Sequence, residues 1–192
     1  DMVDVITRQT DDIRRIVDEF SKFARMPELR RKNENLSALI ESTVSLQQAG
    51  QPNVLINLSQ PKLPIVTSID ATLINQALTN ILKNAGESIE TRMQNPSTSN
   101  NEGIIEVSLK NRSDSFVLNI SDNGVGLPQD RSSLFEPYVT TREKGTGLGL
   151  AIVKKIIEEH GGVLKLEDSA PFENTGIIGA LISIELPKSK NL

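Results

Sequence analysis

The segment TTREKGTGLGLAIVKKIIEEHGG (residues 140–162) runs three glycines at alternate positions into a helical pattern: Gly145, Gly147 and Gly149. Free backbone N–H groups and the helix dipole make such a helix start a favourable anion site. The spacing matches neither the G-x-x-x-x-G-K-[ST] loop nor the G-x-G-x-x-G dinucleotide fingerprint. Arg142 and Lys144, just upstream, could reach phosphate oxygens. The stretch indicates a phosphate-binding loop, and a flexible loop before an ordinary helix is the alternative.

The composition is that of an ordinary soluble globular protein, with 192 residues of which 37% are hydrophobic and 24% charged. This length allows one well-buried domain of about 150 residues with an appendage. The net charge of -4, from 21 basic and 25 acidic residues, argues against nucleic acid as a partner. The absence of cysteine excludes disulfides and thiolate metal sites. No apolar run reaches the roughly 18 residues that span a bilayer, so we expect no direct membrane contact from this segment.

The N-terminal residues 1–26 carry apolar or small residues at alternating steps of three and four, a heptad seam typical of a helix that packs on partner helices. The seam consists of Val3, Ile6, Thr10, Ile13, Val17, Phe20 and Ala24. A bundle or homodimer is favoured, and a helix packed on its own domain is the alternative. Pro27 ends the pattern, and residues 27–35 predict a polar linker. Because the chain begins in mid-pattern without an initiator methionine, we expect it to be part of a longer protein.

The remaining sequence predicts an α+β fold, a two-layer α/β sandwich with helices on one face of a mostly antiparallel sheet. Helices are predicted over residues 35–50, 70–93 and about 146–160. Asn35 and Asp70 are the expected N-caps, and Gly50 is the expected stop of the first helix. Strands are predicted over residues 54–59, 63–69, 104–110, 115–122, 162–168 and 179–187.

The second motif lies on the predicted helix 70–93, where Asn80 and Asn84 are four residues apart and project from one face, with Gln76 one turn earlier. Carboxamide oxygens are hard neutral ligands suited to Mg²⁺, and carboxamide N–H groups can donate to phosphate. The alternative is a pair of ordinary asparagines on an exposed helix face.

The third motif, ISDNGVGLP, ends a predicted strand at Asp122, and Gly124 and Gly126 then allow the backbone to turn or approach a ligand closely. A carboxylate at the end of a strand could accept a hydrogen bond from the amino group of a base. The alternative is a D-N-G hairpin turn.

The joint occurrence of the three motifs in one order is more specific than any one of them. In that order they resemble the N, G1, F and G2 boxes of the ATP-binding catalytic domain of sensor histidine kinases, within the wider GHKL ATPase superfamily. The matching stretches are NILKNAGESI (80–89), DNGVG (122–126), LFEPYVTTREKG (134–145) and GTGLGL (145–150). The resemblance covers residues 36–187, and the residues around the boxes are similar to nitrogen-regulation sensor kinases of the NtrY and NtrB kind. It implies the Bergerat (GHKL) ATP-binding fold with an N-terminal coiled-coil-like helix.

The resemblance implies a site for ATP and Mg²⁺ built from these boxes. Asn84 would hold Mg²⁺ through its side-chain oxygen, Asn80 would contact phosphate or metal, and Asp122 would accept from the adenine amino group. Phe135 would anchor a mobile lid over the phosphates, shaped by the glycines of the last box. The other residues expected at the ATP site are Lys83, Glu87, Gly124, Gly126, Thr140, Thr141, Arg142, Lys144, Gly145, Thr146, Gly147, Leu148 and Gly149.

The resemblance also implies the domain plan and the reaction. Residues 1–26 would be the second helix of the dimerisation domain, 27–35 a linker, 36–188 the catalytic domain and 189–192 a tail. The γ-phosphate of ATP would pass to a histidine on a dimerisation helix and then to an aspartate of a response-regulator receiver domain. That acceptor helix is not in this chain, so no catalytic residue is assigned. The expected location is the cytoplasmic portion of a membrane-bound bacterial sensor.

Two departures from the family pattern are visible. Gly86 lies inside the N-box helix and is expected to cost about 1 kcal/mol relative to alanine if that position is exposed. Ala180 and Ile182 stand in the last strand where the family suggests Thr and Phe, which bears on the wall of the adenine pocket.

Two other functions remain open. One is a GHKL-type ATPase, which would need a water-activating glutamate in the N-box helix, where this chain has Gln76 and Asn80 and has Glu87 on another turn. The other is a nucleotide-binding or dimerisation module without catalysis. The single histidine, His160, is expected to cap the helix 146–160 before an αL stop at Gly161, and is not expected to accept phosphate.

Overall fold

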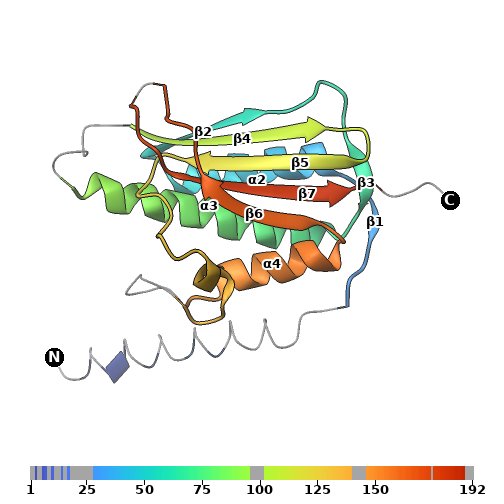
Figure 1. The fold of residues 1–192 in the computed structure, drawn as a ribbon. Helices are drawn as coiled ribbons and strands as arrows, with labels where there is room; N and C mark the ends of the chain where they lie inside the picture. The colour runs from blue at the N-terminus through green and yellow to red at the C-terminus, as the bar shows by residue number, and fades with distance from the viewer. Residues whose placement is uncertain are drawn as a thin grey trace.

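The computed structural model describes residues 28–95, 102–139, 146–173 and 175–188, together with residues 3, 6, 7, 10, 14 and 17. Within these ranges the chain forms a five-stranded sheet with helices on one face (Figure 1). The predicted α+β, two-layer architecture is confirmed.

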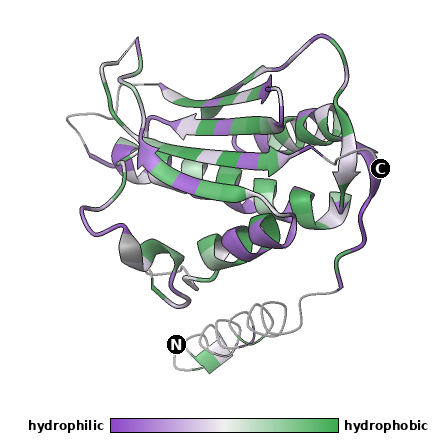
Figure 2. Cartoon of the chain, turned by 45° about the vertical axis from the view of Figure 1, so that its right-hand side comes forward, coloured by the Kyte–Doolittle hydropathy of each residue, from purple (hydrophilic) through white to green (hydrophobic). Residues whose placement is uncertain are grey.

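The sheet has the strand order β2-β4-β5-β7-β6, with β2 and β4 parallel and the other neighbours antiparallel. Its strands are β2 (Val54–Ser59), β4 (Gly103–Asn111), β5 (Ser115–Asp122), β6 (Val163–Asp168) and β7 (Ala180–Pro187). Side chains alternate between the two faces of a strand, and Figure 2 shows the resulting hydrophobic and hydrophilic bands. The antiparallel register brings the end of β5 beside the start of β4, with Asp122 opposite Ile105.

Three helices cover the inner face of the sheet: α2 (Leu36–Gly50), α3 (Ala71–Met93) and α4 (Gly149–Glu159) (Figure 1). The apolar side of α3 is buried at 0–2% exposure: Leu73, Ile74, Ala77, Leu78, Ile81 and Leu82. Burial of a large apolar side chain stabilises a fold by about 1.5–3 kcal/mol. The helix therefore has one rotational setting against the sheet.

The predicted N-caps of α2 and α3 are confirmed. The Asn35 side chain accepts from the backbone N–H of Ala38 at 3.0 Å, and Oδ1 of Asp70 accepts from those of Thr72 and Leu73 at 3.1 and 3.2 Å. These bonds satisfy N–H groups that have no partner within the first helical turn.

The helix α4 starts at Gly149, later than the predicted start near Thr146. Gly147 has a φ of 68°, which a right-handed helix cannot include. The helix ends as predicted, because Gly161 has a φ of 74° and Gly161 and Gly162 donate to the carbonyls of Glu158 and Ile157 at 2.8 and 2.9 Å.

Part of the predicted linker 27–35 is a strand. β1 (Lys32–Asn35) pairs antiparallel with β3 (Val66–Ile69) in a separate two-stranded sheet. The sequence KNEN has low strand propensity, and only backbone pairing with a partner 30 or more residues away makes it a strand. The two strands predicted around the Pro61–Pro64 turn therefore belong to different sheets.

Three of the seven residues of the N-terminal heptad seam, Ile13, Phe20 and Ala24, lie outside the described residues. Its described apolar members, Val3, Ile6 and Val17, are helical and 53–65% exposed. An exposed apolar seam agrees with the interpretation that this helix packs on a partner, and dimerisation stays a prediction. In the part of the chain that the structure describes, no helix is both long and apolar enough to cross a bilayer.

Gly86 is buried inside α3, so the penalty expected for an exposed helical glycine does not apply. A Cβ at this position would fall 1.8 Å from Oε1 of Gln51. The Gln51 amide lies against the helix there and donates to the carbonyl of Leu82 at 3.4 Å and to Oε1 of Gln47 at 3.0 Å. Glycine is the residue that leaves room for this side chain.

His160 is 3% exposed and joins the end of α4 to the start of α3. Its Nε2 accepts from the backbone N–H of Asp70 at 3.0 Å, and its Nδ1 lies 2.7 Å from the carbonyl oxygen of Ile156. A backbone N–H only donates and a carbonyl only accepts, so the ring is neutral with its proton on Nδ1. The predicted position of His160 at the end of the helix is confirmed, and the imidazole there is neutral.

The same junction fixes the segment that precedes the domain. The Asp70 carboxylate accepts from the backbone N–H of Arg30 at 3.0 Å, and Nη2 of Arg31 donates to the carbonyl of Glu159 at 2.6 Å. Burial opposes ionisation of Asp70, but the N–H donors of Arg30, Leu73 and Thr72 outweigh it and lower its pKa. For His160, burial lowers the pKa, and this outweighs the hydrogen bond to the Ile156 carbonyl, which raises it.

We expect the free energy of unfolding to fall as the pH drops from 7 to 5. The unfolded chain binds a proton at the histidine near pH 6.5, whereas the folded chain, with its lowered pKa, does not. Below pH 6.5, the free energy of unfolding should change with pH by up to about 1.4 kcal/mol per pH unit. Denaturant unfolding at several pH values measures it.

The matched control is His160→Gln, which offers an acceptor near the Nε2 position without titrating. Its unfolding free energy should be nearly constant between pH 7 and 5, above the range in which Asp70 protonates. Parallel pH slopes in the two proteins would contradict the neutral buried imidazole.

Candidate nucleotide site

Three of the predicted boxes meet along one flank of α3. The Ser88 hydroxyl accepts from the backbone N–H of Val125 at 3.1 Å, which joins the helix to the G1 stretch. A Cβ on Gly149, at the start of α4, would lie 3.7 Å from Nδ2 of Asn84. The helix therefore brings the stretches 80–89, 122–126 and the described part of the last box, 146–150, into one place.

Asp122 is the last residue of β5 and is 5% exposed. Its Oδ1 accepts from the backbone N–H of Gly124 at 2.8 Å. A Cβ on Gly124 would lie 2.2 Å from the Ser88 hydroxyl and 2.8 Å from the Asp122 carboxylate, so only glycine fits between the helix and the acid. The carboxylate is held in one orientation at the end of the sheet.

Asn123 is a site residue that the sequence interpretation missed. It is 0% exposed, its Oδ1 accepts from the N–H of Ile104 at 2.9 Å, and its Nδ2 donates to the carbonyl of Glu102 at 2.8 Å. These bonds extend the pairing of β5 with the start of β4 by one residue beyond Asp122. The alternative of a D-N-G hairpin turn is therefore excluded. Asn123 and Gly124 instead make hydrogen bonds that fix the Asp122 carboxylate.

The connection from β6 to β7 lies against the Asp122 backbone. A Cβ on Gly179 would fall 1.9 Å from the carbonyl oxygen of Asp122, and a Cβ on Gly126 would fall 3.5 Å from that of Ile178. The side chains of Val125 and Ile178 are 59% and 54% exposed. Apolar side chains thus stand open to solvent beside a buried carboxylate. In the sequence, the only sign that the chain passes close to Asp122 at position 179 is that this residue is a glycine.

The predicted residues on α3 fall into two rows. Asn80 and Asn84 are half-buried on the flank that faces the glycine-rich stretch. Lys83 and Glu87 are on the next row and form an exposed ion pair with each other, with Nζ 3.9 Å from Oε1. Their role at the nucleotide stays a prediction.

The two ends of the predicted lid lie together. Phe135 closes the short helix η1 (Ser132–Phe135), and Nζ of Lys154 lies 5.1 Å from the centre of its ring. Tyr138 has a φ of 68°, and a Cβ on Gly147 would lie 2.6 Å from the Tyr138 backbone. A side chain at position 147 is excluded by this contact as well as by its own φ.

The remaining predicted residues divide into two groups. Thr140, Thr141, Arg142, Lys144 and Gly145 lie outside the described residues. Thr146 is half-buried, whereas Leu148 is 0% exposed and belongs to the hydrophobic core. The Leu148 side chain therefore anchors the loop to the core, and a contact of this residue with the nucleotide stays a prediction.

Among the described residues, no group of three or more His, Cys, Asp or Glu side chains is placed to hold a metal ion. The donors at the site are the neutral carboxamides of Asn80 and Asn84. Such a set fits Mg²⁺ that takes most of its ligands from phosphate and water, because this ion is seldom held by protein atoms alone.

Comparison with known proteins identifies the family. The profile of the family described as "Histidine kinase-, DNA gyrase B-, and HSP90-like ATPase" matches residues 69–190. The chain belongs to this family. Its α+β fold is the GHKL (Bergerat) ATP-binding fold, and it is a catalytic ATP-binding domain of the two-component sensor histidine kinase type, as the resemblance implied.

The relatives agree with this assignment. The nitrogen regulation protein NtrY of Azorhizobium caulinodans is 48% identical over 188 residues, which are 97% of this chain and 24% of that protein. The mycobacterial sensor histidine kinase MprB has a TM-score of 0.68 at 25% identity, covering 84% of this chain and all of that one. Histidine kinase ThkA, solved in complex with the response regulator protein TrrA, has a TM-score of 0.73 at 25% identity, covering 98% of this chain and 51% of that one. The chain spans about a quarter of the length of NtrY and of two similar putative sensor histidine kinases from Rickettsia.

We expect Ser88→Ala to loosen the G1 loop and weaken nucleotide binding. The change leaves the Val125 N–H without its acceptor. Loss of such a bond costs about 1 kcal/mol, or roughly a fivefold change in an equilibrium. Calorimetry with a non-hydrolysable ATP analogue measures the affinity.

The control is Thr91→Ala on the same helix, whose exposed hydroxyl donates only to the carbonyl of Glu87 one turn earlier in the contacts described. It should leave the affinity unchanged. Equal affinities for the Ser88 and Thr91 variants would show that the Ser88 contact does not order the site.

Proposed function

We propose that this domain binds ATP with Mg²⁺ and transfers the γ-phosphate to a histidine on a dimerisation helix, for relay to a response-regulator aspartate. The observation that carries the proposal is the meeting of Asn84, the Asp122 loop and the start of α4 on one flank of α3. Each contributes a different group that a nucleotide requires.

Asp122 is proposed to recognise the base. A buried carboxylate fixed by the Gly124 N–H is an acceptor without a donor of its own, which suits the amino group of adenine and disfavours the carbonyl of guanine. The exposed Val125 and Ile178 side chains beside it suit the faces of a planar base. Ala180 and Ile182, the departures from the family pattern, are both buried in β7 and leave this arrangement in place.

The phosphates are proposed to lie between Asn84 and the N-terminus of α4. The first N–H groups of α4 have no partner within the helix, and its dipole favours negative charge there. Asn84 and Asn80 would hold Mg²⁺ through their side-chain oxygens, and the ion would supply charge neutralisation on the phosphate oxygens. Arg142 and Lys144, outside the described residues, are proposed to add positive charge.

Transfer to a histidine is favoured over hydrolysis by the side chains along α3. A hydrolase of this superfamily would need a glutamate on the N-box helix to activate water, and the positions in line with Asn84 are Asn80 and Gln76. Glu87 is paired with Lys83 on another row. Phosphoryl transfer by positioning alone needs no such base on this domain.

The partners follow from the same proposal. ThkA was solved in complex with a response regulator, and we propose a receiver domain as the partner of this protein. We further propose homodimerisation through residues 1–26 and a cytoplasmic location. The proposed domain plan has 27–35 as the linker, whose last four residues pair with the catalytic domain as β1, 36–188 as the catalytic domain and 189–192 as a tail.

We expect Asn84→Ala to remove the Mg²⁺-dependent part of ATP-analogue affinity, by roughly tenfold or more, because it removes a metal ligand. Titration with and without Mg²⁺ measures this. Asn111→Ala, at the opposite and exposed end of β4, is the control and should bind like the wild type. An unchanged Mg²⁺ dependence in the Asn84 variant, with the fold intact by circular dichroism, would remove the assigned role.

We also expect negligible ATP turnover by the chain alone, and phosphorylation of a separately supplied dimerisation helix pair that carries an acceptor histidine. Phosphate release and acid-labile labelling are the two measurements. Rapid hydrolysis without an acceptor would favour the ATPase alternative, and no nucleotide binding would favour the module without catalysis.

Base recognition gives a separate prediction. The wild type should prefer ATP over GTP, and Asp122→Asn should reduce that preference by about ten- to a hundredfold, since a hydrogen bond to a charged group contributes about 1.5–3 kcal/mol. Asparagine keeps the acceptor for Gly124 and adds a donor that tolerates guanine. Competition binding with both nucleotides measures the ratio, and an unchanged ratio would contradict the role of Asp122.

A further inference from the structure

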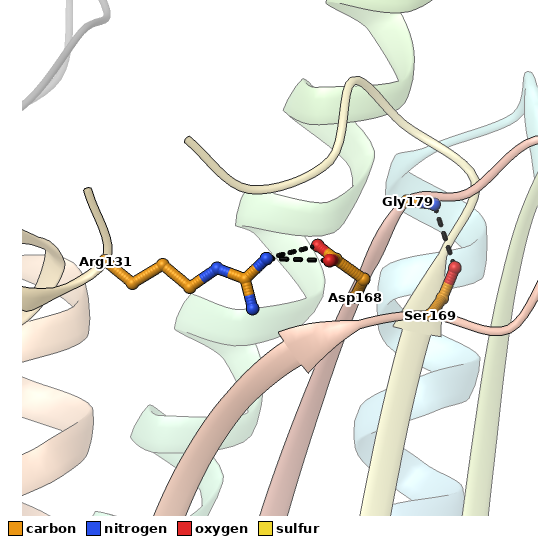
Figure 3. Close-up of polar contacts among 4 residues, drawn as sticks. All are labelled: Arg131, Asp168, Ser169 and Gly179. Carbon is orange, nitrogen blue, oxygen red and sulfur yellow. Dashed lines mark hydrogen bonds and ion pairs between the residues drawn. The ribbon is translucent and has the colours of Figure 1, made fainter. Parts of the chain in front are cut away.

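Arg131 and Asp168 form an ion pair at the edge of the proposed site. Nη2 of Arg131 lies 2.7 Å from both carboxylate oxygens of Asp168 (Figure 3). The side chains are 40% and 53% exposed. Exposed pairs of this kind usually add little to global stability, about 0–1 kcal/mol. This pair is of interest because it joins the segment before η1 to the end of β6.

Asp168 is fixed relative to the base-recognition residue Asp122. It ends β6 opposite Ala180, and the next residue, Ser169, makes two bonds with Gly179. The Ser169 N–H donates to the Gly179 carbonyl at 3.0 Å. The Gly179 N–H donates to the Ser169 hydroxyl at 2.8 Å (Figure 3). Gly179 in turn lies against the Asp122 carbonyl, closer than any side chain would allow.

Arg131 begins the segment that leads to the lid. It directly precedes η1, and it follows the G1 glycines by only a few residues, Gly126 being the nearer. At the far end of η1, Phe135 is held by Lys154 of α4. Arg131 therefore anchors one end of this segment to β6, and Phe135 anchors the other to α4.

The ion pair closes a ring of contacts that starts and ends at Asp122. From Asp122 the chain runs through the G1 glycines to Arg131 and crosses by the ion pair to Asp168. It then continues through Ser169 to Gly179, which contacts the Asp122 backbone. The start of this loop already lies close to the connection between β6 and β7, because a Cβ on Gly126 would fall 3.5 Å from the carbonyl oxygen of Ile178. The ion pair adds a contact at the other end of the loop, between Arg131 and the end of β6.

We propose that Arg131 and Asp168 are positioning residues for nucleotide binding. By closing this ring they hold the second part of the loop, residues 127–131, and with it the start of the lid, at a fixed distance from the base-recognition carboxylate. The inference rests on the proposed ATP site and assigns the pair no contact with the nucleotide. Its effect is on affinity and on the order of the loop, not on global stability.

The test compares Asp168→Ala, Arg131→Ala and the charge swap Arg131→Asp with Asp168→Arg. Each single variant should weaken binding of a non-hydrolysable ATP analogue by roughly fivefold, the change that corresponds to an ion pair of about 1 kcal/mol. The charge swap should restore most of that loss. Glu167→Ala, which removes the same charge one residue earlier on the same exposed strand, should bind like the wild type.

Salt concentration separates this role from a loss of packing. At about 1 M salt, screening acts over roughly 3 Å, so the ratio of affinities between Asp168→Ala and Glu167→Ala should shrink towards one. A ratio that is the same at low and high salt would overturn the proposal, and so would a charge swap that restores nothing.

Hydrogen exchange of the ligand-free chain gives a readout that needs no nucleotide. The amides of Gly124, Val125 and Gly179 are bonded within the ring, to Asp122, Ser88 and Ser169. Their exchange should accelerate in Asp168→Ala and not in Glu167→Ala. Unchanged exchange, or faster exchange with unchanged affinity, would overturn the inference. If the wild type binds no nucleotide, the proposed function fails and the inference fails with it, whereas the exchange rates still report whether the pair orders the loop.

Discussion

The burial of α3 against the sheet is the constraint on which the rest of the structure depends. Its apolar row is almost fully buried, with Ile81 and Ile89 at 0% exposure, so the helix cannot rotate about its axis without exposing core. The adjacent row, which includes Asn84 and Ser88, is then fixed at the edge of the sheet. One row stabilises the fold and the next presents polar groups to the loops. Core packing therefore positions the part of the site on α3, whereas Asp122 and its loop are held by bonds of their own to Gly124 and Ser88.

The sequence contained most of what determines the elements. Caps such as Asn35 and Asp70 act within one turn of the residue that they satisfy, and the two periodicities of helix and strand are local patterns. The same is true of the αL stop at Gly161. The convergence of the boxes was also predictable, because the order of motifs identified the family and the family has one architecture. These features need no knowledge of distant contacts.

What the sequence did not contain depends on pairs of residues far apart in the chain. β1 is a strand only because β3 lies beside it, and Asn123 is a brace only because Ile104 and Glu102 meet it. The burial of Gly86 could not be predicted, because nothing local shows that the Gln51 side chain lies against it. Leu148, inside a box of site residues, faces the core. In each case a tertiary contact overrides a local preference. For the same reason, the proposed role of a single site residue depends more on the structure than on the motif that contains it.

The neutral imidazole of His160 has a consequence for how this protein can be studied. Both of its ring nitrogens are engaged, one with the Asp70 N–H and one with the Ile156 carbonyl, and the ring is 3% exposed. It is the only histidine in the chain, so histidine labelling in nuclear magnetic resonance would give a single imidazole spin system. That signal would lie at the point where the segment of Arg30 and Arg31 joins the domain. The chain thus carries a native spectroscopic reporter of how the catalytic domain is attached to the segment before it, with no substitution to introduce and no second histidine signal to assign.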